Sequence, residues 1–293
     1  MSNLEQNKFI RKLVIIALFA DDLLMNKFFL KGGNALDIIY KISDRASIDI
    51  DVSMIDEFSD DELEDMQSRL ERAFEKVFSD HNLLVFDLKL KSKPKEVFAD
   101  IKEYWGGYSL VFKIIDKEKA VDMSLASMQK QALTLGPKNS TNFKVDISKF
   151  EYCKPCTEAT LDDYTIYVYT PIMIVFEKLR AICQQMPEYA EKVHLKARPR
   201  ARDFYDIYTT INKLKLEDLL LSNENIDIFR AIFAVKHVPV EILSTIEDSR
   251  ELHKGAFQSV MDTVSNIDKE KDFDFYFNYI LNLVERLKPF WKE

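Results

Sequence analysis

The sequence predicts an α/β (α+β) fold in which strands alternate with helices in the first part, while the second part is almost wholly helical. The first observation is a set of short segments with period-two alternation before residue 170, which indicates strands that bury one face. The second is apolar spacing of three and four residues from Pro171 onward, which is typical of helices. With 47% hydrophobic and 31% charged residues, the 293-residue chain can bury a large core without disulfides or structural metal ions.

Each element follows from its local pattern. Helices are predicted over residues 4–25, 34–42, 60–79 and 117–135, and strands over 28–30, 47–53, 83–90, 108–115, 143–148 and 165–169. The helical part is predicted to contain segments 172–186, 202–213, 225–235, 240–263 and 272–288. Asn34 is expected to cap the helix that follows it. We place the domain boundary so that residues 1–168 form the α/β domain and residues 169–293 the helical domain.

Charge and hydropathy narrow the functional classes. The formal net charge of −8 argues against a protein that simply coats nucleic acid, so any RNA or nucleotide must be bound by local patches. The apolar run Leu13–Ala20 is much shorter than the roughly 20 residues of a membrane span, and no membrane contact is expected. Three cysteines, an odd number, favour the reducing cytoplasm.

A glycine pair marks the first candidate site. Gly32 and Gly33 follow Lys31 and stand between a predicted strand and a predicted helix. Glycine permits a sharp turn and close approach of a ligand to the backbone, and a helix start offers free N–H groups to an anion. Phosphate suits such a turn, although most glycine pairs are only tight turns.

Two carboxylates follow within about twenty residues. Asp49 and Asp51 alternate with Ile48, Ile50 and Val52, which places both aspartates on one face of a predicted strand. Carboxylates held this close repel each other and favour a divalent cation such as Mg²⁺. A solvated strand face would explain the aspartate pair alone, but the combination with Gly-Gly brings a phosphate cradle and metal ligands to one edge.

The helical part contributes a third set of candidates. Lys178 lies within an apolar stripe of a predicted helix, where a lysine must extend its ammonium to solvent, pair with an acidic group or contact a ligand. We expect the replacement of Lys178 by alanine to leave the fold intact. Asp203 and Asp206 share one side of a later helix, away from its apolar face. Arg202 ends a basic segment, residues 192–202, that is either a solvated charge run or a phosphate-binding surface. The lysine run over residues 89–95 is interpreted as a strand end and loop.

These motifs together resemble the AbiEii/AbiGii toxin family of nucleotidyltransferases. The resemblance rests first on the sequence KGGNAL at residues 31–36 and on Arg45-Ala-Ser47-Ile-Asp49-Ile-Asp51. Later matches are the segment around Glu177-Lys178 and the sequence RDFYDIY at residues 202–208. Beyond about residue 215 no motif is matched.

The resemblance implies a DNA-polymerase-beta-like nucleotidyltransferase core with a mixed sheet and a helical C-terminal domain that completes the active-site cleft. Members act as toxins of two-protein toxin–antitoxin systems, here of a type IV-like kind, and some cause abortive infection of phage. It further implies that a nucleoside monophosphate moves from an NTP to an acceptor such as the acceptor end of tRNA, and that a cognate antitoxin exists. The wider superfamily often has Gly-Ser where this chain has Gly33-Asn34, so a phosphate-binding hydroxyl is missing, which Ser47 partly replaces.

The resemblance also implies roles for individual residues. Asp49 and Asp51 would be catalytic and would bind Mg²⁺ or Mn²⁺ with a third carboxylate; of Asp122 and Asp146 we choose Asp146, because it lies in a period-two segment. Lys178 and Asp203 are the other expected catalytic residues. The nucleotide-binding residues are expected to be Lys31, Gly32, Gly33, Arg45, Ser47 and Arg202. The alternative function is an NTP-binding regulator or toxin scaffold without turnover, and the intact Asp-x-Asp pair favours the enzyme.

Overall fold

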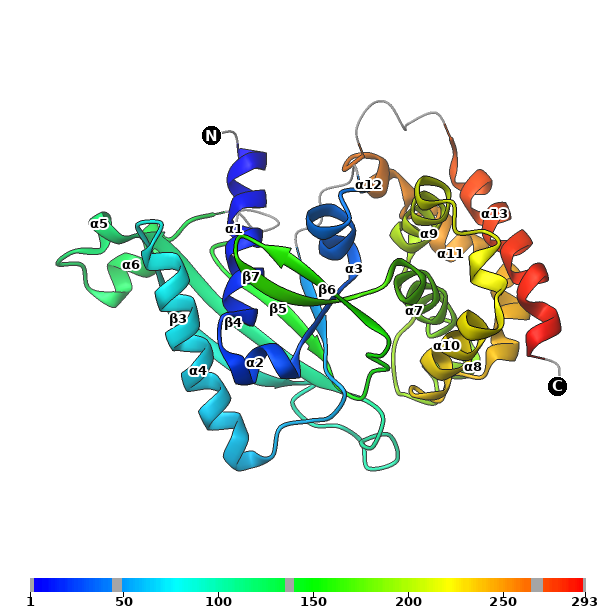
Figure 1. Ribbon diagram of the computed structural model, residues 1–293, viewed down its shortest axis with the longest axis horizontal. Coiled ribbons are helices and arrows are strands. Elements are labelled where there is room, and N and C mark those ends of the chain that lie inside the picture. The colour runs from blue at the N-terminus through cyan, green and yellow to red at the C-terminus, as the bar shows by residue number, and fades with distance from the viewer. Residues whose placement is uncertain (1–2, 44–48, 135–139, 265–270, 292–293) are drawn as a thin grey trace. The chain divides into compact units, whose positions relative to one another are not determined.

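The computed structural model describes residues 3–43, 49–134, 140–264 and 271–291, which form two compact units. The first unit comprises Met1–Asn34, Ser47–Lys102 and Gly106–Val168, and the second comprises Ala35–Ala46, Glu103–Trp105 and Tyr169–Glu293. The second unit therefore also takes in two short segments that the sequence-based division gave to the first domain. The predicted fold class is confirmed, with a mixed sheet in one unit and helices in the other (Figure 1).

The first unit is built on a seven-stranded mixed sheet with the strand order β3-β4-β5-β2-β1-β7-β6. The strands are β1 (Phe29–Lys31), β2 (Ile50–Ser53), β3 (Leu83–Lys93), β4 (Gly107–Asp116), β5 (Phe143–Ser148), β6 (Cys156–Leu161) and β7 (Tyr164–Tyr169). β2 pairs in parallel with β5 and antiparallel with β1, while β4 pairs antiparallel with both β3 and β5. The parallel pairing brings together two strands that are nearly a hundred residues apart in the chain.

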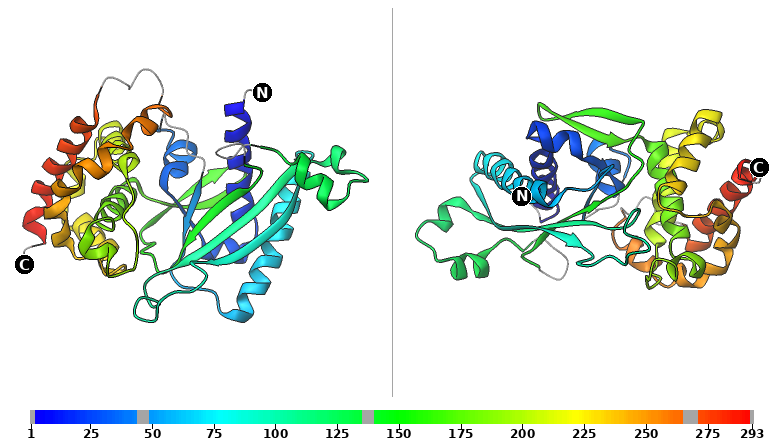
Figure 2. Two further views of the ribbon diagram at one scale, coloured as in Figure 1. Left: turned by 180° about the vertical axis from the view of Figure 1, so that it is seen from behind. Right: turned by 90° about the horizontal axis from the view of Figure 1, so that it is seen from below.

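One face of this sheet carries the hydrophobic core. The helices α1 (Asn3–Phe19) and α4 (Asp60–Ser79) lie on the same face (Figures 1 and 2), and α4 packs against both α1 and β3. The buried residues of the central strands include Ile50 and Val52 of β2 and Val145 and Ile147 of β5. By period-two alternation, the residues between them point to the opposite face.

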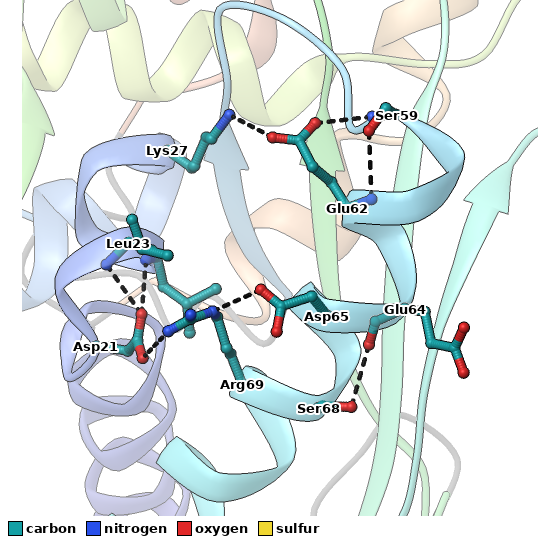
Figure 3. A network of polar contacts seen from close by, with 10 residues as sticks. Asp21, Leu23, Lys27, Ser59, Glu62, Glu64, Asp65, Ser68 and Arg69 are labelled. Atoms are coloured by element: carbon teal, nitrogen blue, oxygen red, sulfur yellow. Dashed lines mark hydrogen bonds and ion pairs between the residues drawn. The ribbon is translucent and has the colours of Figure 1, made fainter.

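A polar network joins the short helix α2 (Asp22–Lys27) to α4 (Figure 3). Asp21 caps α2 by accepting hydrogen bonds from two backbone amides, and its carboxylate pairs with Arg69 at 3.0 Å. Lys27 at the end of α2 approaches Glu62 of α4 at 3.4 Å. These contacts fix the end of α2 against α4 and explain why the predicted helix over residues 4–25 is two helices, since Asp21 starts a new one.

Strand β3 contains a β-bulge between Phe86 and Lys89, where the pairing with β4 shifts by one residue. Asp87 within the bulge has a left-handed backbone with φ of 54°. After the bulge, Lys91 pairs with Ser109 of β4. A bulge of this kind leaves one extra residue on the bulged strand and bends it locally.

Two further differences from the predicted elements have local causes. The predicted helix over residues 117–135 is replaced by two short helices, α5 (Lys117–Ala120) and α6 (Leu125–Gln131), because Ser124 caps a new start and Asp122 has a positive φ of 62°. Strand β6 was not predicted, since the sequence of residues 156–161 has little apolar alternation. Of the described residues, none belongs to a helix long and apolar enough to cross a membrane.

The second unit is helical. Its elements are η1 (Ala35–Ile39), α7 (Pro171–Cys183), α8 (Pro187–Ala190), α9 (Ala201–Leu214), η3 (Leu219–Leu221), α10 (Asn223–Ala234), η4 (Val240–Ser249), α11 (Arg250–Lys254), α12 (Phe257–Met261), α13 (Phe273–Leu287) and η6 (Lys288–Phe290). α7 packs against α9 and α10, and α13 packs against α9. Phe204 of α9 stacks with Phe277 of α13 at a ring-centroid distance of 5.2 Å. Aromatic packing of this kind forms the core between these helices.

The core of the first unit yields a stability prediction. Phe74 of α4 is fully buried and meets Phe112 of β4 edge-on at 5.0 Å between ring centroids. We expect Phe74→Ala to lower the free energy of unfolding by about 3–5 kcal/mol, because it removes a buried ring and leaves a cavity. Urea unfolding followed by circular dichroism measures this loss. The exposed neighbour Glu75 provides the control, since Glu75→Ala should stay within about 0.5 kcal/mol of the unaltered protein.

Candidate functional site

A row of polar residues, called the aspartate row below, crosses the centre of the sheet on the face opposite α1 and α4. Lys31 of β1 pairs with Asp51 of β2, Asp51 pairs with Asp146 of β5, and Asp146 pairs with Ser109 of β4. Because residues that are register partners on neighbouring strands project to the same face, their side chains share one surface. Asp146 thus lies on a strand beside Asp51, as the alternation predicted, whereas Asp122 lies in the turn between α5 and α6.

The glycine turn meets this row at Asp51. Gly32 has a left-handed backbone with φ of +68°, and a Cβ added there would lie 3.1 Å from Oδ2 of Asp51. A side chain at this position would be strained and would crowd the carboxylate, so glycine is required for the close approach. Gly32 and Gly33 begin the short helix α3 (Gly32–Asn34), and both are buried. The structure therefore brings the glycine pair and the Asp51 carboxylate together.

Asn34 has a role that the sequence did not predict. It does not cap a helix, because α3 already begins at Gly32. Its buried side chain instead accepts a hydrogen bond from Nη1 of Arg11 at 2.7 Å and donates one to the backbone carbonyl of Asp49 at 2.6 Å. Asp49 itself lies one residue before β2 and is exposed. The amide of Asn34 therefore ties α1 and the glycine turn to the start of the aspartate strand.

Lys31 is directed at acidic and hydroxyl groups inside the first unit. Its ammonium lies 3.5 Å from Oε1 of Glu151 and 3.3 Å from Oγ of Ser148, and both charged side chains are more than 90% buried. A buried carboxylate needs such a cation, because an uncompensated charge in the interior is costly. Lys31 thus neutralises Glu151 next to the row, and its expected contact with phosphate stays a prediction.

Asp146 is bound by two lysines from different strands. Lys93 at the end of β3 and Lys144 on β5 each approach Oδ1 of Asp146 at 2.8 Å. Burial lowers the pKa of the Lys93 ammonium, whereas for Lys144 the Asp146 carboxylate outweighs burial and raises the pKa. Asp49 also attracts Lys144 electrostatically. The sequence-based interpretation of Lys93 as a mere strand end is therefore incomplete.

The chemistry of the aspartates fits a magnesium ion. Carboxylate oxygens are the hard donors that Mg²⁺ prefers, and Asp51 and Asp146 are direct neighbours on parallel strands with Asp49 two residues before Asp51. Among the described residues, however, no three His, Cys, Asp or Glu side chains are gathered closely enough to hold a metal as they stand. Asp146 faces lysines instead, so a bound cation would compete with Lys93 and Lys144. Arg45 and Ser47, expected to bind nucleotide, lie outside the described residues.

In the helical unit, Lys178 is the centre of a buried ion cluster. Its ammonium lies 2.8 Å from both Oδ1 of Asp203 and Oδ2 of Asp206, and all three residues are buried. Arg200 completes the cluster at 2.9 Å from Asp203, whereas Arg202 is exposed. Burial by itself would lower the pKa of Lys178, but the charges of Asp203 and Asp206 outweigh it and raise the pKa.

Two residues of this cluster have no role predicted from the sequence. Asp206 belongs to the RDFYDIY segment, and its spacing of three from Asp203 on a helix is the signal that could have assigned it to the cluster. His253 of α11 carried no signal, because only the fold brings it to the start of α9. There its Nδ1 accepts a hydrogen bond from the backbone N–H of Arg200 at 2.9 Å, and its ring packs against Phe204. Burial, with the charge of Arg200, lowers the pKa of this imidazole to about 4.

The buried cluster changes the expected outcome of replacing Lys178. We expect Lys178→Met to lower the free energy of unfolding by about 3–5 kcal/mol, because two buried carboxylates lose their shared cation. On this geometry we therefore expect the fold to depend on Lys178, in contrast to the expectation from the sequence. Adding Asp206→Asn should recover part of the loss by removing one uncompensated charge. Chemical denaturation of both variants, with the exposed Lys213→Met as control, measures this, and an additive result would contradict it.

His253 makes the stability of the protein sensitive to acid. Its imidazole has an ordinary pKa of 6.5 and a pKa of about 4 in the fold, so the unfolded chain binds the proton more tightly. The stabilisation is present above pH 6.5 and is lost as the pH falls toward 4, by up to about 3 kcal/mol. We expect His253→Asn, which can still accept the Arg200 amide hydrogen, to flatten unfolding stability between pH 7 and 4.5. The same slope in both proteins would exclude His253 as the cause.

Comparison with known proteins places this chain in a family. The family model described as nucleotidyl transferase AbiEii toxin, Type IV toxin–antitoxin system, matches residues 16–279. Among solved structures, JHP933 from Helicobacter pylori is similar with 15% identity and a TM-score of 0.49, covering 97% of this chain and 93% of that chain. MenT4, a nucleotidyltransferase toxin from Mycobacterium tuberculosis H37Rv, has 11% identity and a TM-score of 0.46, covering 97% and 84%. No curated protein matches the sequence.

The family match spans most of the chain and includes the glycine turn, the aspartate strand β2, strand β5 and the ion cluster around Lys178. The predicted resemblance is thereby confirmed. This chain belongs to the AbiEii family of nucleotidyl transferase toxins and is a nucleotidyltransferase.

Proposed function

We propose that this protein transfers a nucleoside monophosphate from an NTP to an RNA acceptor, with Mg²⁺ or Mn²⁺ held by Asp49, Asp51 and Asp146. The observation that carries the proposal is the pairing of Asp51 with Asp146 on neighbouring parallel strands, beside the left-handed Gly32. This arrangement offers carboxylate oxygens for a cation and a closely approachable backbone for phosphate within a few ångströms of each other.

Residues of the first unit have separate proposed roles in binding the triphosphate and the metal. Gly32 and Gly33, which are buried, are proposed to contact the triphosphate through their backbone because neither has a side chain in the way, and Asp49 and Asp51 would hold the cation that orients it. The bound metal would offset the charge of the phosphates and lower the pKa of the acceptor hydroxyl. Asn34 positions Asp49 by its hydrogen bond to the Asp49 carbonyl. Arg45 and Ser47 remain proposed nucleotide contacts on the strength of the motif alone.

The helical unit supplies cationic groups in this proposal. Lys178, Asp203 and Arg202 are proposed on the strength of the family motifs to act on the triphosphate, and because Asp203 and Asp206 already take up the Lys178 ammonium, a contact with phosphate would require Lys178 to leave at least one of them. Cations near phosphates stabilise the negative charge that spreads over them in the transition state. Arg202 is exposed, so its guanidinium is available to a ligand without breaking a buried contact.

The acceptor is proposed to be the acceptor end of a tRNA or another RNA. The segment over residues 192–202 supports an RNA partner, because its basic side chains are mostly exposed in a protein that is acidic as a whole. Those basic residues are Lys192, His194, Lys196, Arg198, Arg200 and Arg202. A cognate antitoxin is proposed as the protein partner, in keeping with the toxin–antitoxin family, and the cytoplasm as the compartment.

A transfer assay tests the proposal. Purified protein is incubated with each labelled NTP, Mg²⁺ and total RNA, and labelled RNA is expected with at least one nucleotide. Asp51→Asn and Asp146→Asn should each reduce labelling at least about a hundredfold, because each removes a charged ligand of the cation. Asp163→Asn in the turn between β6 and β7 is the matched control and should label normally, since its left-handed φ of 54° suits asparagine.

Chelation of the metal provides the second arm of the same assay. EDTA should abolish labelling, and added Mg²⁺ or Mn²⁺ should restore it. Labelling by the Asp51→Asn protein at the normal rate would contradict the assigned site. Binding of an NTP with no transfer to any RNA would instead favour the alternative function of a triphosphate-binding regulator or toxin scaffold without turnover.

A further inference from the structure

Lys93 and Lys144 form a lysine clamp on Asp146, the carboxylate proposed as the third metal ligand. Both ammonium groups lie 2.8 Å from the same Oδ1 atom, although they come from different strands. Two like charges gathered on one carboxylate repel each other, so the arrangement carries more positive charge than Asp146 alone can neutralise. The clamp therefore also offsets part of the charge of the neighbouring Asp49, which attracts Lys144 as well.

The sheet is built so that Lys93 can reach this carboxylate. Lys93 of β3 pairs with Gly107 of β4, and Gly107 pairs with Ser148 of β5. Gly107 has no side chain, and a Cβ there would collide with the carbonyl oxygen of Ile147 at 2.0 Å. Lys93 therefore lies on the same face as Ser109 and Asp146, and Gly107, its partner on β4, adds no side chain to that face. Lys144 reaches Asp146 along its own strand, because residues two apart on a strand share a face.

The clamp lysines can also leave Asp146. The side chain of Lys93 is 50% exposed and that of Lys144 is 39% exposed, in contrast to the buried Lys178 and Lys31. Exposed ion pairs are weak, and the four-carbon stem of lysine allows its ammonium to swing to a new partner. A divalent cation that takes an oxygen of Asp146 must displace at least part of the clamp, because the ammonium groups and the metal compete for the same lone pairs.

We propose that Lys93 and Lys144 form a phosphate-binding site that becomes available when the metal binds. Before metal binding, the two lysines neutralise Asp146. Once Asp146 binds the metal, the lysines bind the β- and γ-phosphates of the incoming triphosphate. The inference rests on the proposed function, since it takes Asp146 as a metal ligand. After exchange, both ammonium groups would have given up Oδ1 of Asp146, and a triphosphate held by the metal would bring new negative charge to the face on which they lie. No covalent step is involved, only an exchange of ion-pair partners.

The proposal predicts effects of opposite sign on two ligands, which a purely structural role would not produce. Lys93→Met and Lys144→Met remove the charge and keep the stem. Each should bind Mn²⁺ about threefold to tenfold more tightly than the unaltered protein, because a competitor and a repelling charge are gone. Each should bind inorganic tripolyphosphate, measured with saturating Mg²⁺, about threefold to tenfold more weakly. Electron paramagnetic resonance measures free Mn²⁺, and calorimetry measures tripolyphosphate binding.

Lys91→Met is the matched control. Lys91 lies on β3 two residues before Lys93, on the same face, and is exposed. Its variant should leave Mn²⁺ affinity unchanged, and Lys93→Arg should keep both affinities near normal, because the charge is retained. Unchanged or weaker Mn²⁺ binding by both clamp variants would overturn the inference while leaving the proposed function standing. Failure of the unaltered protein to bind either Mn²⁺ or tripolyphosphate would overturn the proposed function and the inference with it.

Discussion

The two-residue period of β2 and β5 is the constraint on which the site depends. Alternate residues of these strands are apolar, and Ile50, Val52, Val145 and Ile147 are buried in the core, so the intervening positions must face away from it. The parallel register then sets Asp51 directly beside Asp146. The hydrophobic core thus determines where the carboxylates lie, and a slip of one residue in either strand would bury an aspartate and expose a valine. The packing that stabilises the unit therefore also specifies the geometry of the aspartate row.

The two units compensate their acidic residues in different ways. In the helical unit, Lys178 is fixed between two buried carboxylates, and its charge cannot be removed without leaving them unpaired. In the sheet unit, Asp146 is compensated by exposed lysines whose contacts with it are weak. A fixed pair maintains a structure, whereas an exchangeable pair can give way to a ligand. Burial therefore separates the cations that hold the protein together from those that are free to respond to substrate.

The sequence predicted most of the fold because its strands alternate and its helices repeat regularly. Helix α4 began and ended where expected, and β2 and β5 carried the expected residues. Prediction was weaker where a single capping residue decides the outcome, as at Asp21 and Ser124, because a cap interrupts a pattern that otherwise continues. Within the site, local spacing predicted that Asp49 and Asp51 share a strand face and that Gly32 and Gly33 form a turn between a strand and a helix. The roles of Asn34 and His253 could not be predicted, since each depends on a partner brought near only by folding.

The bulge in β3 determines on which face of the sheet the later side chains of this strand lie. Before the bulge Phe86 pairs with Lys113, and after it Lys89 pairs with Val111, so one extra residue reverses which face the later side chains occupy. This reversal buries Leu88 and Leu90 against the helices and turns the lysines toward the aspartate row. Regular pairing of the same residues without the bulge would set Lys89 opposite Leu110 and turn those lysines into the core, whereas loss of Asp87 together with the bulge would leave Lys89 opposite Val111. The face on which the lysines lie therefore depends on the register of the later part of β3, and that register is as much a part of the site as its chemistry.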